Sequence, residues 1–174
     1  RYLDSIPESW SGVTLHHLLR HTAGISDYEG WFDGYDTQVY SDYMAQADAP
    51  GRIAREARRR PLDFEPGAKF SYSNSAYILL GQVVEKASGI SYDEFVRTRI
   101  LQPLGMTRSG QDNSDEILPD RADGYRLRPG AFPRAWFNGL TAADYLNAHY
   151  QLMVPPQGDA GLVTTTRDLY RWDR

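Results

Sequence analysis

A tyrosine and an asparagine two positions apart, Tyr72 and Asn74, are the residues of this chain best suited to carry chemistry. A phenol hydroxyl can accept and return a proton, and a primary amide can donate and accept hydrogen bonds to a bound substrate. In a segment that is not helical, side chains at this spacing can face the same cleft. Because free tyrosine has a pKa of ~10, Tyr72 is a base near neutrality only where a cation stabilises the phenolate or a Lys shares the proton. A Tyr packed at a helix start that an Asn caps would explain the pair almost as well.

The residues around this pair predict a turn, a short extended piece and then a helix. Pro66 fixes φ and Gly67 supplies a positive φ, so the two favour a turn before Tyr72. After Asn74, apolar residues recur at helical spacing, and Gly89 stands where a helix-ending glycine belongs. The residues that define this helix are Tyr77, Leu80, Val84 and Ala87.

Five further helices are predicted, each from its capping or stop residues and its apolar spacing. The first is capped by Thr14, carries Leu15, Leu18 and Leu19 on one face and ends at Gly24, and the second is marked by Ile53, Ala54 and Ala57 and ends at Pro61. The third begins with a capping box of Ser91 and Glu94, buries Phe95, Val96 and Ile100, and ends at Pro103. The last two begin at Thr141 with Asp144 and at Thr165 with Asp168. One short strand is expected near Tyr125. The expected fold class is mainly α, because few alternating segments remain from which to build a sheet.

Two histidines, His17 and His21, lie four positions apart on a predicted helix, which is the spacing of zinc-protease ligands. Such a site needs a Glu base after the first histidine, and this chain has Leu18 there. We therefore favour histidines that are packed or hydrogen-bonded beside a helix end over a metal site. An acidic group of Asp112, Asp115 and Glu116 is of the type used in glycosidases, but its polar loop favours solvated carboxylates.

Composition excludes several classes of function. The chain has 174 residues, of which 41% are hydrophobic, and this is enough for a globular core. Its net charge of −4 argues against a nucleic-acid partner, since the basic run at residues 58–60 is better explained as a solvated helix end. No apolar run reaches the ~20 residues of a membrane-spanning helix. The absence of Cys excludes thiolate catalysis and thiolate metal sites.

The run from Phe64 to Asn74, F-E-P-G-A-K-F-S-Y-S-N, resembles the F-x-P-G-x-x-F-x-Y-S-N segment of the class C-like branch of the serine β-lactamase and penicillin-binding-protein superfamily. This branch includes DD-peptidases, β-lactamases and esterases. Four other stretches resemble its segments in the same order: residues 13–25 (I-T-I-x-H-L-L-x-H-T-S-G-L), 81–92, 100–106 (I-x-x-P-L-G-M) and 160–172 (G-G-L-x-S-T-x-x-D-L-x-x-W). Five ordered matches are strong support for the family, where any one would be weak.

The departures from the family pattern bear on the mechanism. The family's nucleophile stands in an S-x-x-K motif, and no Ser here is followed by Lys at that spacing. The late K-T-G or H-x-G strand is missing too, and both motifs are expected outside these residues. Ala23 and Ala160 replace a usual Ser and Gly, neither of them a reactive group. The resemblance thus implies that residues 1–174 are an internal, mostly helical segment of a β-lactamase-like domain, truncated at both ends. That segment would be the helical region of a two-domain fold made of a helical cluster and an α/β sandwich. Residues 131–157 match no part of the pattern.

The resemblance implies a serine hydrolase that acts through an acyl-enzyme on a β-lactam, a D-alanyl peptide, an ester or an amide, without metal or organic cofactor. Tyr72 would help accept the serine proton, pass it to the leaving group and activate water, and Asn74 would bind the substrate amide or the motif's Lys. The alternatives are a catalytically inactive penicillin-binding-type sensor or scaffold, and an unrelated helical binding module. Expressed alone, the 174 residues are expected to be inactive and to self-associate through an exposed apolar face. The family also favours a location outside the bacterial cytoplasm, which the lack of Cys does not decide.

Overall fold

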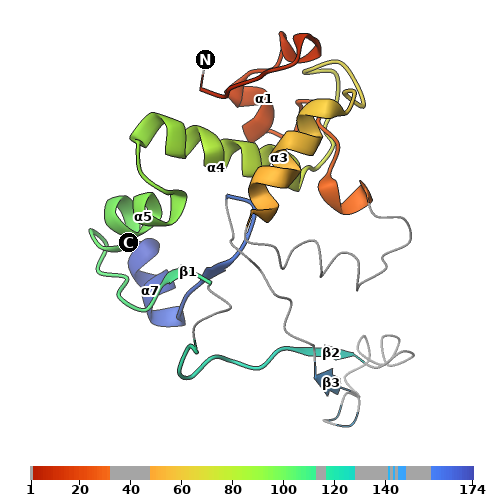
Figure 1. Ribbon diagram of the computed structural model, residues 1–174. Helices are drawn as coiled ribbons and strands as arrows, with labels where there is room; N and C mark the ends of the chain where they lie inside the picture. Colours follow the sequence, from red (N-terminus) through yellow and green to blue (C-terminus); the bar gives the residue numbers. More distant parts are fainter. Residues whose placement is uncertain are drawn as a thin grey trace. The chain divides into compact units, whose positions relative to one another are not determined.

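The computed structural model describes residues 2–31, 48–112, 117–127, 141, 143, 145–147 and 158–174. The chain divides into two compact units (Figure 1). The larger unit comprises Arg1–Asn113 with Met153–Arg174, and the smaller comprises Ser114–Leu152. The residues of the candidate site, Tyr72 and Asn74, belong to the larger unit.

Helices dominate the larger unit, as the sequence predicts. They are η1 (Glu8–Trp10), α1 (Leu15–Leu19), η2 (Tyr28–Trp31), α3 (Ala49–Arg59), α4 (Asn74–Ser88), α5 (Tyr92–Val96), the π-helical turn η4 (Arg97–Leu101) and α7 (Thr166–Trp172). Its described strands are β1 (Gly110–Gln111) and β4 (Leu162–Val163), which pair antiparallel with Gly110 opposite Val163. A helix-rich chain with a few short strands is therefore confirmed for the described residues.

The described part of the smaller unit is an antiparallel pair of β2 (Tyr125–Leu127) and β3 (Tyr145–Asn147), with Tyr125 opposite Asn147. The strand expected near Tyr125 is confirmed. The helix expected to start at Thr141 is limited to a 3-10 turn at Ala143, because the chain forms β3 from Tyr145. Pairing with a partner strand here overrides the local capping signal. Asp144, like Asp115, Glu116 and most of residues 131–157, lies outside the described residues.

Helix α4 starts and ends where its sequence signals predict. Ser73 caps it, since the Ser73 Oγ accepts a hydrogen bond from the Ala76 N–H over 3.2 Å, and Gly89 ends it in the left-handed conformation (φ 76°). The buried residues are Ser75, Ala76, Ile78, Leu79, Gly81 and Val83. The four residues whose helical spacing locates this helix are not its most buried ones: Tyr77, Leu80 and Val84 are half-buried and Ala87 is exposed. Because α4 is apolar over most of its circumference, periodicity locates the helix without selecting its inner face.

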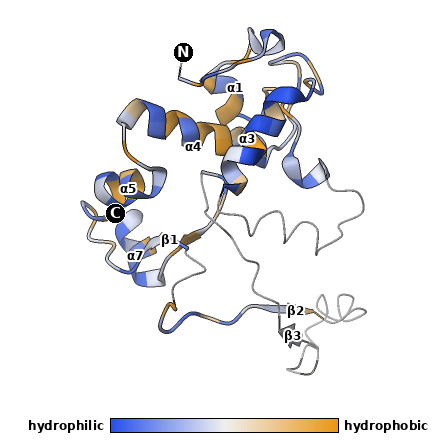
Figure 2. Cartoon of the chain, in the orientation of Figure 1, coloured by the Kyte–Doolittle hydropathy of each residue, from blue (hydrophilic) through white to orange (hydrophobic). Residues whose placement is uncertain are grey.

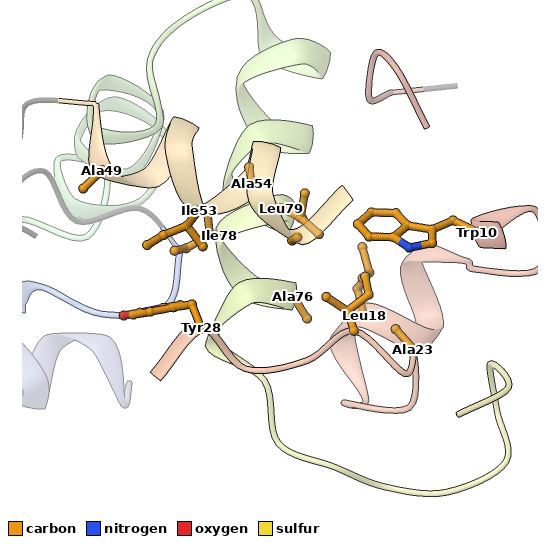
Figure 3. Packing of buried hydrophobic residues seen from close by; sticks show 12 residues of the cluster. Trp10, Leu18, Ala23, Tyr28, Ala49, Ile53, Ala54, Ala76, Ile78 and Leu79 are labelled. Carbon is orange, nitrogen blue, oxygen red and sulfur yellow. The ribbon is translucent and has the colours of Figure 1, made fainter. Parts of the chain in front are cut away.

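The hydrophobic core lies where α4 packs against α1 and α3 (Figure 3). Ile53 of α3 lies beside Ile78 of α4, and Trp10 lies beside Leu18 of α1 (Figure 3). Burying side chains of this size stabilises the fold by about 2 kcal/mol each. Figure 2 shows α3 mainly in hydrophilic colours, with hydrophobic colour on the N-terminal half of α4. Ile53, Ala54 and Ala57, the residues that predicted α3, are its buried side.

Helix α1 is shorter than the sequence predicts. Thr14 caps it, with the His17 N–H donating to Thr14 Oγ1 over 3.2 Å, but its C-cap is Arg20 and not Gly24. Of its three leucines only Leu18 is buried, while Leu15 and Leu19 are exposed.

Gly24 lies beyond the end of α1 and allows the loop there to approach the backbone of Phe64 closely. Its φ is 77°, and a Cβ there would lie 2.1 Å from the carbonyl oxygen of Phe64. The Asp63 N–H bonds the Gly24 carbonyl over 2.7 Å, and the Ser71 N–H bonds the His21 carbonyl over 2.9 Å. The loop after α1 therefore holds the extended segment that leads to Tyr72.

Helices α5 and α7 begin at their predicted caps. The Ser91 Oγ accepts from the Glu94 N–H over 3.2 Å, while the Tyr92 N–H donates to the Glu85 carboxylate over 2.9 Å. Val96 is buried, with Leu101 and Met106, in a small second cluster, whereas Phe95 and Ile100 are half-buried.

The start of α7 carries a buried carboxylate. The Asp168 N–H donates to Thr165 Oγ1 over 3.2 Å, and Asp168 Oδ2 accepts from the Arg108 N–H and the Ser109 hydroxyl, each over 2.8 Å. Burial alone raises the pKa of Asp168, but these bonds and Arg171 outweigh it and hold the pKa below its ordinary value. Asp168 therefore ties the segment before β1 to α7.

The outer face of α7 is apolar. Leu169, Tyr170 and Trp172 are each half or more exposed. This fits the expected apolar face, and self-association through it stays a prediction.

Within the part of the chain that the structure describes, no helix is both long and apolar enough to cross a membrane.

Candidate functional site

Tyr72 and Asn74, the pair singled out by the sequence, are joined by a hydrogen bond. The Tyr72 hydroxyl lies 3.0 Å from Asn74 Oδ1. Tyr72 ends the extended segment and is 55% exposed, while Asn74 is the first residue of α4 and is half-buried. The structure thus brings the two predicted site residues together at an open surface. It also corrects the capping alternative, because Ser73 and not Asn74 caps the helix.

A third residue, Asp27, completes the polar group and was missed by the sequence analysis. Asn74 Nδ2 donates to both carboxylate oxygens, at 3.3 Å to Oδ1 and 3.1 Å to Oδ2. The Asn74 backbone N–H also lies 3.3 Å from Asp27 Oδ1. The carboxylate therefore sits at the N-terminus of α4, where a negative charge is favourable. The only local signal for it was an Asp ahead of a turn.

His21 supports the backbone and the ring of the tyrosine. Its Nδ1 accepts a hydrogen bond from the Ser73 N–H over 3.2 Å, so this nitrogen carries no proton in that contact. Its ring lies 4.5 Å from the Tyr72 ring and is stacked 4.9 Å from the Tyr77 ring, centroid to centroid. His21 itself has a φ of 54°, an uncommon conformation for a residue other than glycine. The interpretation of His21 as a packed, hydrogen-bonded histidine is confirmed.

A metal site gains no support from the other histidine. The Nδ1 of His17 is buried and has no hydrogen-bond partner among the described residues. Within those residues, no group of three His, Asp or Glu side chains could hold a metal ion.

A second carboxyl, Asp159, is linked through Tyr28 to the loop that carries Asp27. The Tyr28 hydroxyl donates to Asp159 Oδ2 over 3.0 Å, and the Tyr28 backbone N–H donates to the Ser75 Oγ over 2.9 Å. Burial and, to a smaller extent, the charge of Asp27 raise the pKa of Asp159 to about 6, although its hydrogen bonds act in the opposite direction. Tyr28 therefore connects the loop that carries Asp27 both to α4 and to the segment before β4.

Of the acidic group considered for glycosidase chemistry, only Asp112 lies among the described residues. Asp112 is buried, which corrects the expectation of a solvated carboxylate, and its backbone N–H bonds the Gly161 carbonyl over 2.6 Å.

The Tyr72 hydroxyl lacks a basic or cationic partner among the described residues. Its hydrogen-bond partner is Asn74, and no described Lys or Arg side chain bonds to it. The nearby Lys69 places its Nζ over the ring of Phe64, 4.9 Å from the centroid. Proton transfer through Tyr72 therefore needs a partner beyond these contacts.

Comparison with known proteins places this geometry in a family. A family model described as Beta-lactamase matches residues 1–174. The chain belongs to the β-lactamase family. This confirms the resemblance drawn from the five sequence stretches.

Several relatives of this β-lactamase-family chain are much longer than it is. Penicillin-binding protein 4* of Bacillus subtilis (strain 168) is 33% identical over 180 residues, which cover 100% of this chain and 37% of that protein. Esterase EstB of Burkholderia gladioli is 39% identical over 101 residues, covering 56% of this chain and 26% of the esterase. The crystal structure of a penicillin-binding protein from Bacillus halodurans is similar with a TM-score of 0.71 and 29% identity, over 95% of this chain and 47% of that one. The chain thus spans less than half the length of each.

Proposed function

We propose that this chain is the Tyr-x-Asn-bearing helical region of a two-domain serine hydrolase that acts through an acyl-enzyme. The substrate would be a β-lactam, a D-alanyl peptide, an ester or an amide, since one constellation of groups serves all four. The observation that carries the proposal is the hydrogen-bonded Tyr72–Asn74 pair, open to solvent in a chain of the β-lactamase family.

In the proposed reaction, a serine of an S-x-x-K motif attacks the substrate carbonyl carbon. We place that serine in the remainder of the full-length protein, because no Ser among the 174 residues has Lys at this spacing. As the new C–O bond forms, the serine proton passes to Tyr72 and the motif's Lys, and from them to the leaving group as its bond to the carbonyl carbon breaks.

Tyr72 would then take a proton from the water that attacks the acyl carbonyl carbon, and return it to the serine oxygen as the bond between that oxygen and the carbonyl carbon breaks. Asn74 would hold the substrate amide or the Lys. Among the described residues, the hydrogen-bond partner of the Tyr72 hydroxyl is the neutral amide of Asn74. The Lys of the S-x-x-K motif therefore supplies the positive charge that Tyr72 needs in order to act as a base. No step requires a metal or an organic cofactor.

The test uses the full-length protein with a chromogenic β-lactam, a p-nitrophenyl ester and a D-alanyl peptide. Rapid mixing should reveal a burst, and mass spectrometry should find a stoichiometric acyl adduct on the serine of the S-x-x-K motif. An intact S-x-x-K motif with no adduct from any of the three substrates would reject the enzyme. Binding of these compounds without turnover would then favour the alternative, an inactive sensor or scaffold domain.

A further inference from the structure

We propose that Asp27 is a positioning residue of this site: its carboxylate fixes the amide of Asn74 so that the amide oxygen, and not the nitrogen, faces the Tyr72 hydroxyl. The inference deepens the proposed function and rests on it as far as the reaction is concerned. Asp27 itself touches neither the Tyr72 hydroxyl nor, in the proposed reaction, the substrate.

The argument begins with the chemistry of the two groups. An amide can turn its oxygen or its nitrogen toward a neighbour, and the two ends have almost the same shape. An ionised carboxylate accepts hydrogen bonds and cannot donate one. Both carboxylate oxygens of Asp27 lie within 3.3 Å of the same terminal atom of the Asn74 amide. That atom has to be the nitrogen, because only the NH₂ group can donate to a carboxylate. The oxygen is left for Tyr72, 3.0 Å away.

This orientation sets the direction of the Tyr72 proton. With an acceptor oxygen in front of it, the hydroxyl donates to Asn74 and turns its lone pairs toward the open side of the site. A reversed amide would present an N–H to the phenol and occupy one of those lone pairs. Asp27 thereby leaves the lone pairs of the Tyr72 oxygen free to accept a hydrogen bond from a nucleophile on the open side.

Hydrogen bonds within its own loop fix the position of Asp27. Its carbonyl accepts from the Gly30 N–H over 3.1 Å, and its Oδ1 lies 3.4 Å from the Glu29 N–H. The next residue, Tyr28, is 2% exposed and is bonded through its backbone to Ser75 of α4. The carboxylate is thus anchored by a turn and by a buried neighbour on the helix that carries Asn74.

A purely structural role for Asp27 makes a different prediction. The carboxylate also accepts the Asn74 backbone N–H at the start of α4, so its loss can weaken the helix without changing the amide. The variant Asp27→Asn separates these roles, because its side-chain oxygen can still accept the backbone N–H. It removes the acceptor-only group, so the Asn74 amide is no longer held in one orientation. Asp27→Glu keeps an acceptor-only group.

The kinetic test is a double-mutant cycle in the full-length protein, with Asp27→Asn, Asn74→Ala and both together. We expect Asp27→Asn to lower kcat by roughly 10-fold to 10²-fold, as misplacement of a catalytic group does, with KM changed less than about 2-fold. In the Asn74→Ala background the same change should have almost no further effect, because the amide on which it acts is gone. Independent losses that multiply would overturn the proposal. So would Asp27→Glu with no higher kcat than Asp27→Asn.

The matched control is Asp63→Asn, which neutralises an exposed carboxylate that makes no side-chain hydrogen bond or ion pair within the part of the chain that the structure describes. We expect wild-type kcat from it. A loss equal to that of Asp27→Asn would mean that charge alone, and not the contact with Asn74, is responsible.

A second readout does not depend on activity. The Nδ2 protons of Asn74 are identified in ¹⁵N NMR spectra by their absence from Asn74→Ala, and thermal unfolding of each variant confirms that it is folded. Asp27→Asn should shift these two signals and speed their exchange with water, whereas Asp63→Asn should leave them in place. Unchanged Asn74 signals in folded Asp27→Asn would sink the proposal. Shifted signals in a protein with no acyl adduct would uphold the Asp27–Asn74 orientation and reject the proposed function alone.

Discussion

The hydroxyl of Tyr28 donates a hydrogen bond to the carboxyl of Asp159, which follows it by 131 residues, over 3.0 Å. The contact fixes the segment before β4 to the loop that carries Asp27. Gly158 makes the approach possible: its φ is 74°, and a Cβ there would lie 2.4 Å from the carbonyl oxygen of Tyr77. Two segments that are far apart in the sequence therefore meet at α4, next to the candidate site.

The raised pKa of Asp159 makes stability depend on pH. Burial raises this pKa from an ordinary 3.8 to about 6, so between these values the unfolded chain ionises while the folded chain keeps its proton. The free energy of unfolding should therefore fall as pH rises through this window, by about 2–3 kcal/mol for this one group, and stay lower above it.

The variant Asp159→Asn keeps an acceptor for Tyr28 and cannot ionise. It should be more stable than the wild-type protein at pH 7 and lose most of that advantage at pH 4. Urea unfolding at both values measures the difference. A stability difference between the two proteins that is the same at both pH values would show that Asp159 has an ordinary pKa.

Replacing Tyr72 by Phe in the full-length protein should lower turnover while the fold survives. The ring is exposed and the hydroxyl bonds only Asn74 within the described residues, so its removal disturbs little packing. General acid–base groups contribute ~10²–10⁴ in rate, and kcat should fall on that scale. Tyr170→Phe, at an exposed tyrosine of α7, is the control and should turn over normally. Wild-type kcat in Tyr72→Phe would remove this residue from the mechanism.

The capping assignment predicts that Ser73, and not Asn74, carries the stability of the helix start. Ser73→Ala removes the oxygen that accepts the Ala76 N–H and should lower the free energy of unfolding by ~1 kcal/mol. Ser91→Ala, which removes the corresponding cap of α5, is a matched comparison of the same chemistry. Asn74→Ala should instead act mainly on turnover. Chemical denaturation of the three variants decides, and a larger loss of stability for Asn74→Ala than for Ser73→Ala would contradict the assignment.

Local sequence signals predicted the elements around the site well. The helix that begins at Asn74 and ends at Gly89, and the closeness of Tyr72 to Asn74, both follow from residues within a few positions of one another. Asp27 could not be found in this way. It precedes Asn74 by 47 residues and reaches it only because the loop after α1 folds back on α4. Contacts of this kind depend on tertiary packing, which periodicity and caps do not encode.

The same limit explains why apolar spacing locates α4 but does not identify its buried face. Its apolar residues occupy most of the helix surface, and the buried side is chosen by α1 and α3, which the sequence does not position. Ile78→Ala should therefore cost about 2–5 kcal/mol, because Ile78 is 1% exposed and leaves a cavity. Val84→Ala, on the face that periodicity selected and half-buried, should cost clearly less. Equal losses in thermal or denaturant unfolding would show that the two faces contribute equally to stability.

The 174 residues expressed alone should not form an acyl-enzyme. Tyr72, Asn74 and Asp27 are groups that assist a nucleophile, and no Ser in the chain has the S-x-x-K spacing of the family's nucleophile. Removing the nucleophile from such a constellation abolishes nearly all of its rate acceleration, because the groups act as a unit.

Incubation with a chromogenic β-lactam and a p-nitrophenyl ester, followed by mass spectrometry, should therefore leave the mass of the isolated chain unchanged. The full-length protein, treated in parallel, should gain one acyl group on a serine outside these residues. Circular dichroism of the isolated chain has to show its helices, since an unfolded chain would be unreactive for a trivial reason. A stoichiometric adduct on any Ser of the folded chain would place the nucleophile within it, and the role proposed for the S-x-x-K serine would then be wrong.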